Sequence, residues 1–221
     1  MASRTNACSE LTRFWLEARH GYLVSEGVPV KVPSAHSDID LMALHPLGQT
    51  FALPTGATIG PRLIVETKDE HDWEPSGREF GQWLRTDVAK MDGGLFIPRG
   101  TKGEKKFSML REEHFDLAVG LFGSDDFDRL FVVHAIDPRV LAELGPALSQ
   151  GRIYWTTVPE IVHDLLRWYR THQQQTTLRN TLVGDLFHLL VGFCGLQLPD
   201  AQPPLHWRNR PCSSVPLSLE P

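Results

Sequence analysis

The 221-residue sequence has few cysteines, few lysines and no long apolar run. Its three cysteines lie far apart, which argues against a disulfide scaffold and a CxxC zinc site and favours a reducing cytoplasm. The polar first ten residues do not form a secretory signal. The most apolar stretch, residues 182–198, is interrupted by Asp185 and His188 and is too short to span a bilayer. We therefore expect no membrane segment.

Two common catalytic motifs are also missing. The sequence has no glycine-rich phosphate-binding loop and no GxSxG pentapeptide, which argues against P-loop and serine-hydrolase enzymes. The net charge of −5 argues against a protein that binds nucleic acid through bulk charge alone. It does not exclude a nuclease, because acids in an active site lower the net charge and only a local basic face is needed.

What is present is the composition of an ordinary folded domain, with 41% hydrophobic and 22% charged residues. The length predicts one domain over residues 1–196. Residues 197–221 hold six of the 16 prolines and are expected to form an irregular tail. The predicted elements alternate between helices and strands, which indicates an α/β fold with a mixed central sheet, helices on both faces and additional C-terminal helices.

The predicted boundaries follow from apolar periodicity, caps and turn residues. Helices are expected over residues 9–25, 78–92, 108–122, from 138 onward, 159–171 and 177–194. Strands are expected over residues 28–32, 39–44, 63–68, 95–97, 130–136 and 153–157, with a hairpin-like connection over 46–60. The apolar band of helix 177–194 is too wide for a surface helix, so this helix is either buried in the domain or part of a homodimer interface.

An acid and a lysine share one face of the strand over 63–68. Glu66 and Lys68 are two residues apart, so their side chains point the same way. Asp40 stands at the entrance of the preceding apolar strand, and pairing of the two strands would bring Asp40 and Glu66 together. A divalent cation relieves the repulsion between two such carboxylates, and hard oxygen ligands suit Mg²⁺ or Mn²⁺.

These residues resemble the motif of the PD-(D/E)xK nuclease superfamily. Its aspartate corresponds to Asp40, and its glutamate and lysine correspond to Glu66 and Lys68. Mrr-type nucleases and archaeal Holliday-junction resolvases also carry a first-helix glutamate about eleven residues before a Gly-aromatic pair, as Glu10 precedes Gly21-Tyr22 here. The residue before Asp40 is Ile39 rather than the superfamily's proline. Many members also lack that proline.

The resemblance implies a restriction-endonuclease-like fold and metal-dependent hydrolysis of DNA. Asp40, Glu66, the Thr67 carbonyl and Glu10 would hold Mg²⁺ or Mn²⁺, and Lys68 would position water or stabilise the phosphate charge. The products would be a 5′-phosphate and a 3′-hydroxyl. The biological role would be in defence, such as antiviral defence, or in DNA repair. DNA is favoured over RNA only through the resemblance, so RNA is not excluded.

Further residues are candidates for binding nucleic acid. A basic loop holds Arg99, Lys102, Lys105 and Lys106, which either grip phosphates beside the site or form a solvated surface. Gln82, on the predicted helix after the motif, is either a site residue or a structural glutamine. His134 and His188 lie in apolar runs and are expected in or near the core.

Two other functions are compatible with the sequence. The first is a catalytically silent nuclease-fold subunit that a recruiting protein brings into a larger complex. The second is a different metal hydrolase, in which His36 and His71 with Asp38 form a two-histidine-carboxylate site. No tight HxH or HxxxH pair supports the second.

Overall fold

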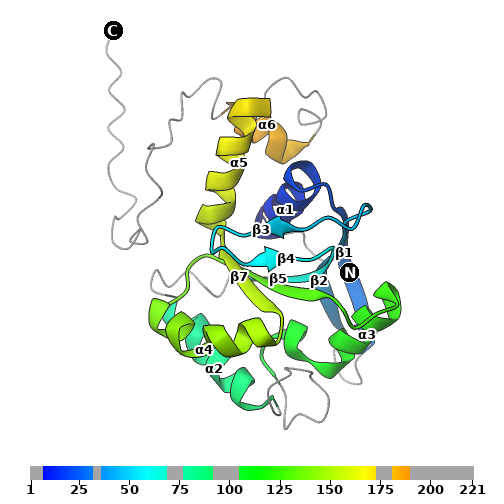
Figure 1. Cartoon of the computed structure of the whole chain (residues 1–221), viewed down its shortest axis with the longest axis vertical. Coiled ribbons are helices and arrows are strands. Elements are labelled where there is room, and N and C mark those ends of the chain that lie inside the picture. The colour runs from blue at the N-terminus through cyan, green and yellow to red at the C-terminus, as the bar shows by residue number, and fades with distance from the viewer. Residues whose placement is uncertain (1–6, 32–35, 69–76, 92–104, 173–180, 190–221) are drawn as a thin grey trace.

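Five strands form one mixed sheet in the order β1-β2-β5-β6-β7, in a computed structural model that describes residues 7–31, 36–68, 77–91, 105–172 and 181–189. The β1-β2-β5 half is antiparallel, whereas β6 runs parallel to β5 and to β7. Helices cover both faces: α1, α5 and α6 lie on one side of the sheet and α2, α3 and α4 on the other (Figure 1). The expected α/β class with a mixed sheet and flanking helices is confirmed.

The sheet strands are β1 (Leu23–Lys31), β2 (His36–Leu44), β5 (Arg62–Lys68), β6 (Asp128–Val133) and β7 (Ile153–Thr157). A separate two-stranded hairpin, β3 (Phe51–Ala52) with β4 (Thr58–Ile59), lies within the expected connection. The helices are α1 (Ala7–Phe14), η1 (Trp15–Arg19), α2 (Arg78–Ala89), η2 (Ser108–Leu110), α3 (Glu112–Phe122), α4 (Pro138–Gln150), α5 (Val158–His172) and α6 (Leu182–His188). The expected strand over 95–97 lies outside the described residues.

The sheet separates two apolar cores. One core holds Trp15, Leu41 and Val65 together with side chains of α5 and α6. The other holds Met42, Ile64 and Phe131 together with side chains of α2, α3 and α4. Because β6 is covered on both faces, all six of its residues are buried. Two of these, Asp128 and Arg129, are charged, and they extend the strand beyond its predicted apolar run.

Helix starts follow the expected local chemistry. Asp137 caps α4 by accepting a hydrogen bond from the Arg139 N–H, and Pro138 occupies the first turn. At the start of α5, Glu160 accepts from the Thr157 N–H and donates its own N–H to the Thr157 hydroxyl. This is a capping box, and it fixes where β7 turns into α5.

The first helix differs from its predicted range of 9–25. The chain leaves α1 through the π-helix η1, which ends at Arg19, and enters β1 at Leu23. Gly21 provides the turn with a φ of +74°, a value that glycine adopts without strain. The Gly-aromatic pair therefore ends the helix, and Tyr22 begins the path into the sheet.

Three further predictions change with the structure. Ser108 starts the short η2 rather than the long helix, which begins at Glu112. His134 is exposed just past the end of β6, so its expected place in the core is wrong. His188 is half-buried and its Nδ1 lies 2.8 Å from the Tyr169 hydroxyl.

Helix α6 divides its apolar residues between the core and solvent. Phe187 is buried against the core that contains α1, while Leu182 is 86% exposed and Leu186 is 51% exposed. The rest of the predicted helix 177–194 is outside the described residues. None of the helices in the described ranges combines the length and apolar character that crossing a membrane would require.

Candidate functional site

Asp40 lies where β2 changes the face that its side chains present. Ile39 packs in the same core as Met42, three residues later, although strict alternation would place them on opposite faces. Gly27, opposite this position on β1, has a φ of +59°. Next to this change of face, the Asp40 side chain reaches Thr67 of β5.

The last backbone pair of β2 and β5 joins Leu41 to Val65. Asp40 immediately precedes Leu41 and Glu66 immediately follows Val65, so the two acids lie just beyond this pair on adjacent strands. Beyond this pair, the Asp40 side chain, rather than the β2 backbone, contacts β5. Its Oδ2 accepts the Thr67 N–H at 2.7 Å and the Thr67 hydroxyl at 3.1 Å. A carboxylate oxygen therefore occupies the place where the strand ladder would continue.

Glu66 and Lys68 form an ion pair at the carboxyl end of β5. Lys68 Nζ lies 2.7 Å from Glu66 Oε1. Glu66 is 2% exposed, and it also accepts the N–H of Ser108 at 3.1 Å and that of Met109 at 2.7 Å, both from η2. The buried Glu66 carboxylate thus has one cation and two backbone N–H donors as partners, which offset the cost of its burial.

The electrostatics of the site couple the two acids. Burial, and then the nearby charge of Glu66, raise the pKa of Asp40 to about 6. Lys68 and the two hydrogen bonds from Thr67 act in the opposite direction. Asp40, Glu66 and Lys68 are therefore near enough to affect one another, and the field between the two acids favours a cation.

The remaining expected ligand, Glu10, is not gathered with these acids. Glu10 is exposed on α1, and its charge acts on Arg13 of the same helix. The neighbouring Ser9 is the residue that α1 presents to β5, where its Oγ lies 2.9 Å from Thr67 Oγ1. Across the described ranges, no three His, Cys, Asp or Glu side chains form a group that could hold a metal.

The expected phosphate-binding residues fall into two groups. Arg99 and Lys102 lie outside the described residues. Lys105 is 3% exposed, and burial lowers its pKa, whereas Lys106 is exposed with its Nζ 4.1 Å from the centre of the Trp83 ring. Gln82 is exposed on α2. Of the histidine alternative, His71 and the side chain of His36 also lie outside the described part.

Three parts of this site were not identified from the sequence. Ser9 was predicted only as a helix cap, and the backbone of η2 carries no side-chain signal at all. His114 of α3 is fully buried with its Nε2 2.9 Å from Ser37 Oγ. Burial lowers the pKa of His114, and the charge of Glu66 opposes that shift, so the ring lies within the field of the site. His114 directly follows Glu112 and Glu113 in the first turn of α3, so its polar neighbours gave no sign that it would be buried.

Comparison with known proteins finds no family model, no curated protein and no solved structure that matches this chain. The site is accordingly interpreted from its own geometry and chemistry.

Proposed function

We propose that this protein is a metal-dependent nuclease with a restriction-endonuclease-like fold that hydrolyses DNA phosphodiester bonds. The observation that carries the proposal is that two acids of neighbouring strands, Asp40 of β2 and Glu66 of β5, lie near enough to affect each other and the Lys68 ammonium, which pairs with Glu66. An ion pair that only stabilises the fold rarely has a second buried acid beside it. The second acid repels the first, which destabilises its own charged form without adding to the stability of the fold.

The donor set fits a hard divalent cation. The Asp40 and Glu66 carboxylates and the Thr67 carbonyl would hold Mg²⁺ or Mn²⁺, with water completing the shell. The repulsion that raises the pKa of Asp40 would be relieved by such an ion. The exposed Glu10 is left as a contributor through water only.

The residues of the chain would divide the work. A divalent cation supplies Lewis acidity toward the scissile phosphodiester. Glu66 orients the Lys68 ammonium, which stabilises negative charge as it develops on the phosphate oxygens. Water attacks phosphorus, the bond from phosphorus to the 3′ oxygen breaks, and that oxygen takes a proton. The products are a 5′-phosphate and a 3′-hydroxyl.

Phosphate binding beside the site would come from the Arg99–Lys106 loop, whose described lysines are the buried Lys105 and the exposed Lys106. DNA is the expected substrate, and RNA is an alternative substrate to be tested. A place in antiviral defence or DNA repair, inside the cytoplasm and alongside a recruiting protein, is part of the same proposal.

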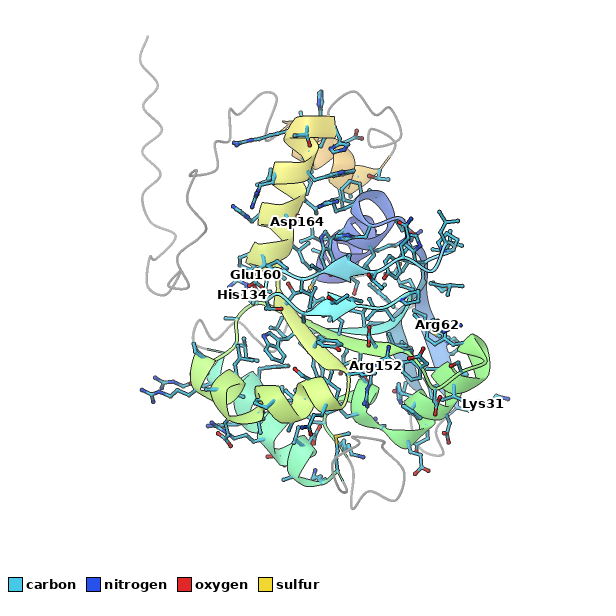
Figure 2. All side chains as sticks on the ribbon, viewed as in Figure 1. Lys31, Arg62, His134, Arg152, Glu160 and Asp164 are labelled. Atoms are coloured by element: carbon cyan, nitrogen blue, oxygen red, sulfur yellow. The ribbon has the colours of Figure 1, made fainter. Side chains whose placement is uncertain are left out.

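The deciding experiment incubates the purified chain with plasmid, single-stranded DNA and RNA in Mg²⁺, Mn²⁺ or EDTA. We expect cleavage that requires metal and that falls at least about 100-fold in Lys68→Ala, the loss typical of removing one transition-state stabiliser. Lys31→Ala is the matched control, because Lys31 is an exposed lysine at the outer end of β1 (Figure 2). Metal-independent cleavage, or equal rates in both variants, would refute the proposal.

One observation favours the alternative of a catalytically silent, nuclease-fold binding subunit. Glu66 is almost fully buried and already has three partners, so its role would be to tie β5 to η2. That function predicts DNA binding without cleavage on any substrate, and retention of binding in Lys68→Ala.

A further inference from the structure

The Asp40 carboxylate is held by two hydroxyl groups that connect it to the first helix. The Thr67 hydroxyl donates to Asp40 Oδ2 at 3.1 Å, so its single proton is committed to that bond. The 2.9 Å hydrogen bond between Ser9 Oγ and Thr67 Oγ1 must then be donated by Ser9. The proton order is therefore Ser9 to Thr67 to Asp40.

This chain of donors runs through the interior, on the face of β5 opposite to Glu66 and Lys68. Ser9 is 6% exposed and Thr67 is 5% exposed, so bulk water does not compete for their hydroxyls. A buried hydroxyl without a partner is costly, which means that each group is fixed by the next. Helix α1 thereby helps to fix a side chain of β2, the strand next to β5.

Within the described residues, both hydrogen bonds to the Asp40 carboxylate end on one oxygen. The Thr67 N–H and hydroxyl both reach Oδ2, and within the described part of the chain Oδ1 accepts no hydrogen bond. Asp40 lies beyond the last backbone pair of β2 and β5, so on the side that faces β5 its side chain has no strand ladder beside it. Its orientation is set by these donors.

We propose that Ser9 and the Thr67 side chain are positioning residues that aim Asp40 Oδ1 at the divalent cation. The inference rests on the proposed function, because it presumes that Asp40 is a ligand. Neither hydroxyl touches the cation or the substrate. Partners that orient a metal ligand in this way typically contribute 10–100-fold to metal affinity.

The test measures Mn²⁺ affinity of the full chain by isothermal titration calorimetry, without any nucleic acid. We expect Thr67→Val to weaken Mn²⁺ binding about tenfold or more, and Thr67→Ser, which keeps the hydroxyl, to stay within about threefold of the wild type. Ser9→Ala should lose about threefold. The Ser9→Ala, Thr67→Val double variant should bind like Thr67→Val alone, because Ser9 acts through Thr67.

Thr12→Val is the matched control. Thr12 is a buried hydroxyl of the same helix that donates to the Cys8 carbonyl at 2.7 Å, away from Asp40, so its loss should leave Mn²⁺ affinity unchanged. Circular dichroism checks folding, and if Thr67→Val fails to fold, Ser9→Ala and Thr67→Ser decide the question.

Asp40→Asn should abolish Mn²⁺ binding if Asp40 is a ligand. If it does, two results would overturn the inference but not the proposed function. One is wild-type Mn²⁺ affinity in Thr67→Val, and the other is a double variant whose loss of affinity equals the sum of the two single losses. A wild-type chain that binds no Mn²⁺ would overturn the proposed metal site, and the inference with it.

Discussion

Asp40 is an acid held where its charged form is disfavoured. Its pKa is raised from an ordinary value of 3.8 to about 6, first by burial and then by Glu66. In the unfolded chain this group loses its proton near pH 4, and in the folded chain near pH 6. The folded state is therefore favoured below pH 4, and the free energy of unfolding falls as the pH rises through this window.

We expect Asp40→Asn to be more stable than the wild type at pH 7.5. A shift of about two pH units corresponds to roughly 3 kcal/mol, and the amide recovers much of it because it never ionises, so a gain of about 1–3 kcal/mol is expected. Urea denaturation at pH 7.5 and at pH 3.5 measures the difference, which should vanish at the lower pH. Asp125→Asn, in an exposed loop, is the control. A lower free energy of unfolding for Asp40→Asn than for the wild type at pH 7.5 would contradict the conclusion that the charged form of Asp40 destabilises the fold.

At the scale of elements, glycine decides how closely two helices pack. A Cβ on Gly81 of α2 would lie 2.5 Å from Val140 Cγ2 of α4. Nearby, Arg85 and Glu143 pair across the same two helices, with 2.6 Å between Nη2 and Oε2. The missing side chain at Gly81 therefore sets the distance between α2 and α4 on this face of the sheet.

Gly81→Ala should destabilise the protein by about 1–3 kcal/mol, the usual cost of overpacking a filled interface. Gly120→Ala is its matched control, because Gly120 is an exposed helical glycine with nothing within 4 Å of an added Cβ. That variant should gain about 0.5–1 kcal/mol from helix propensity. Chemical denaturation of the two variants should give opposite signs, and equal signs would refute the packing argument.

At the scale of the whole molecule, the two ends of the central strands have different tasks. The candidate site lies at the carboxyl end of β5. At the amino end, buried Asp128 accepts from Arg152 Nε at 2.7 Å and from the Gly60 N–H at 2.5 Å, which ties β6, β7 and the hairpin together. Figure 2 shows Arg62 and Arg152 at this end, away from His134 at the carboxyl end of β6.

Arg152→Gly should therefore separate stability from function. Removing the cation leaves Asp128 buried without its charge partner, and we expect a loss of about 2–3 kcal/mol. Glycine tolerates the φ of +55° that Arg152 adopts, so the variant adds no backbone strain. Metal binding and cleavage per folded molecule should stay unchanged at low temperature. Arg85→Ala, which breaks an exposed pair, should cost less than about 1 kcal/mol.

Homodimerisation through the predicted helix 177–194 stays a prediction about the whole molecule. Its described part, α6, exposes Leu182 and Leu186 while Phe187 packs inward. We expect a mass of twice 24.9 kDa at micromolar concentration, and a shift toward monomer in Leu186→Glu. Leu47→Glu, at a leucine that is 77% exposed elsewhere, should leave the mass unchanged. A sharp monomer mass for the wild type would contradict the prediction.

Features that depend on near neighbours along the chain could be predicted before the structure was known. Strand alternation placed Glu66 and Lys68 on one face, and the Asp137-Pro138 step marked the start of α4. The α/β class also followed from the alternation of elements. These properties arise from side-chain periodicity and backbone conformation, which act over a few residues.

The surroundings of the two acids depend instead on contacts between distant parts of the chain. The donors to Glu66 come from η2, more than 40 residues later, and the hydroxyl that supports Thr67 comes from α1, 58 residues earlier. The same packing turned Ser9 inward and left Glu10 exposed. These partners meet because the helices pack on the two faces of the sheet. The energy of that packing is distributed over two apolar cores, so no short motif in the sequence predicts it.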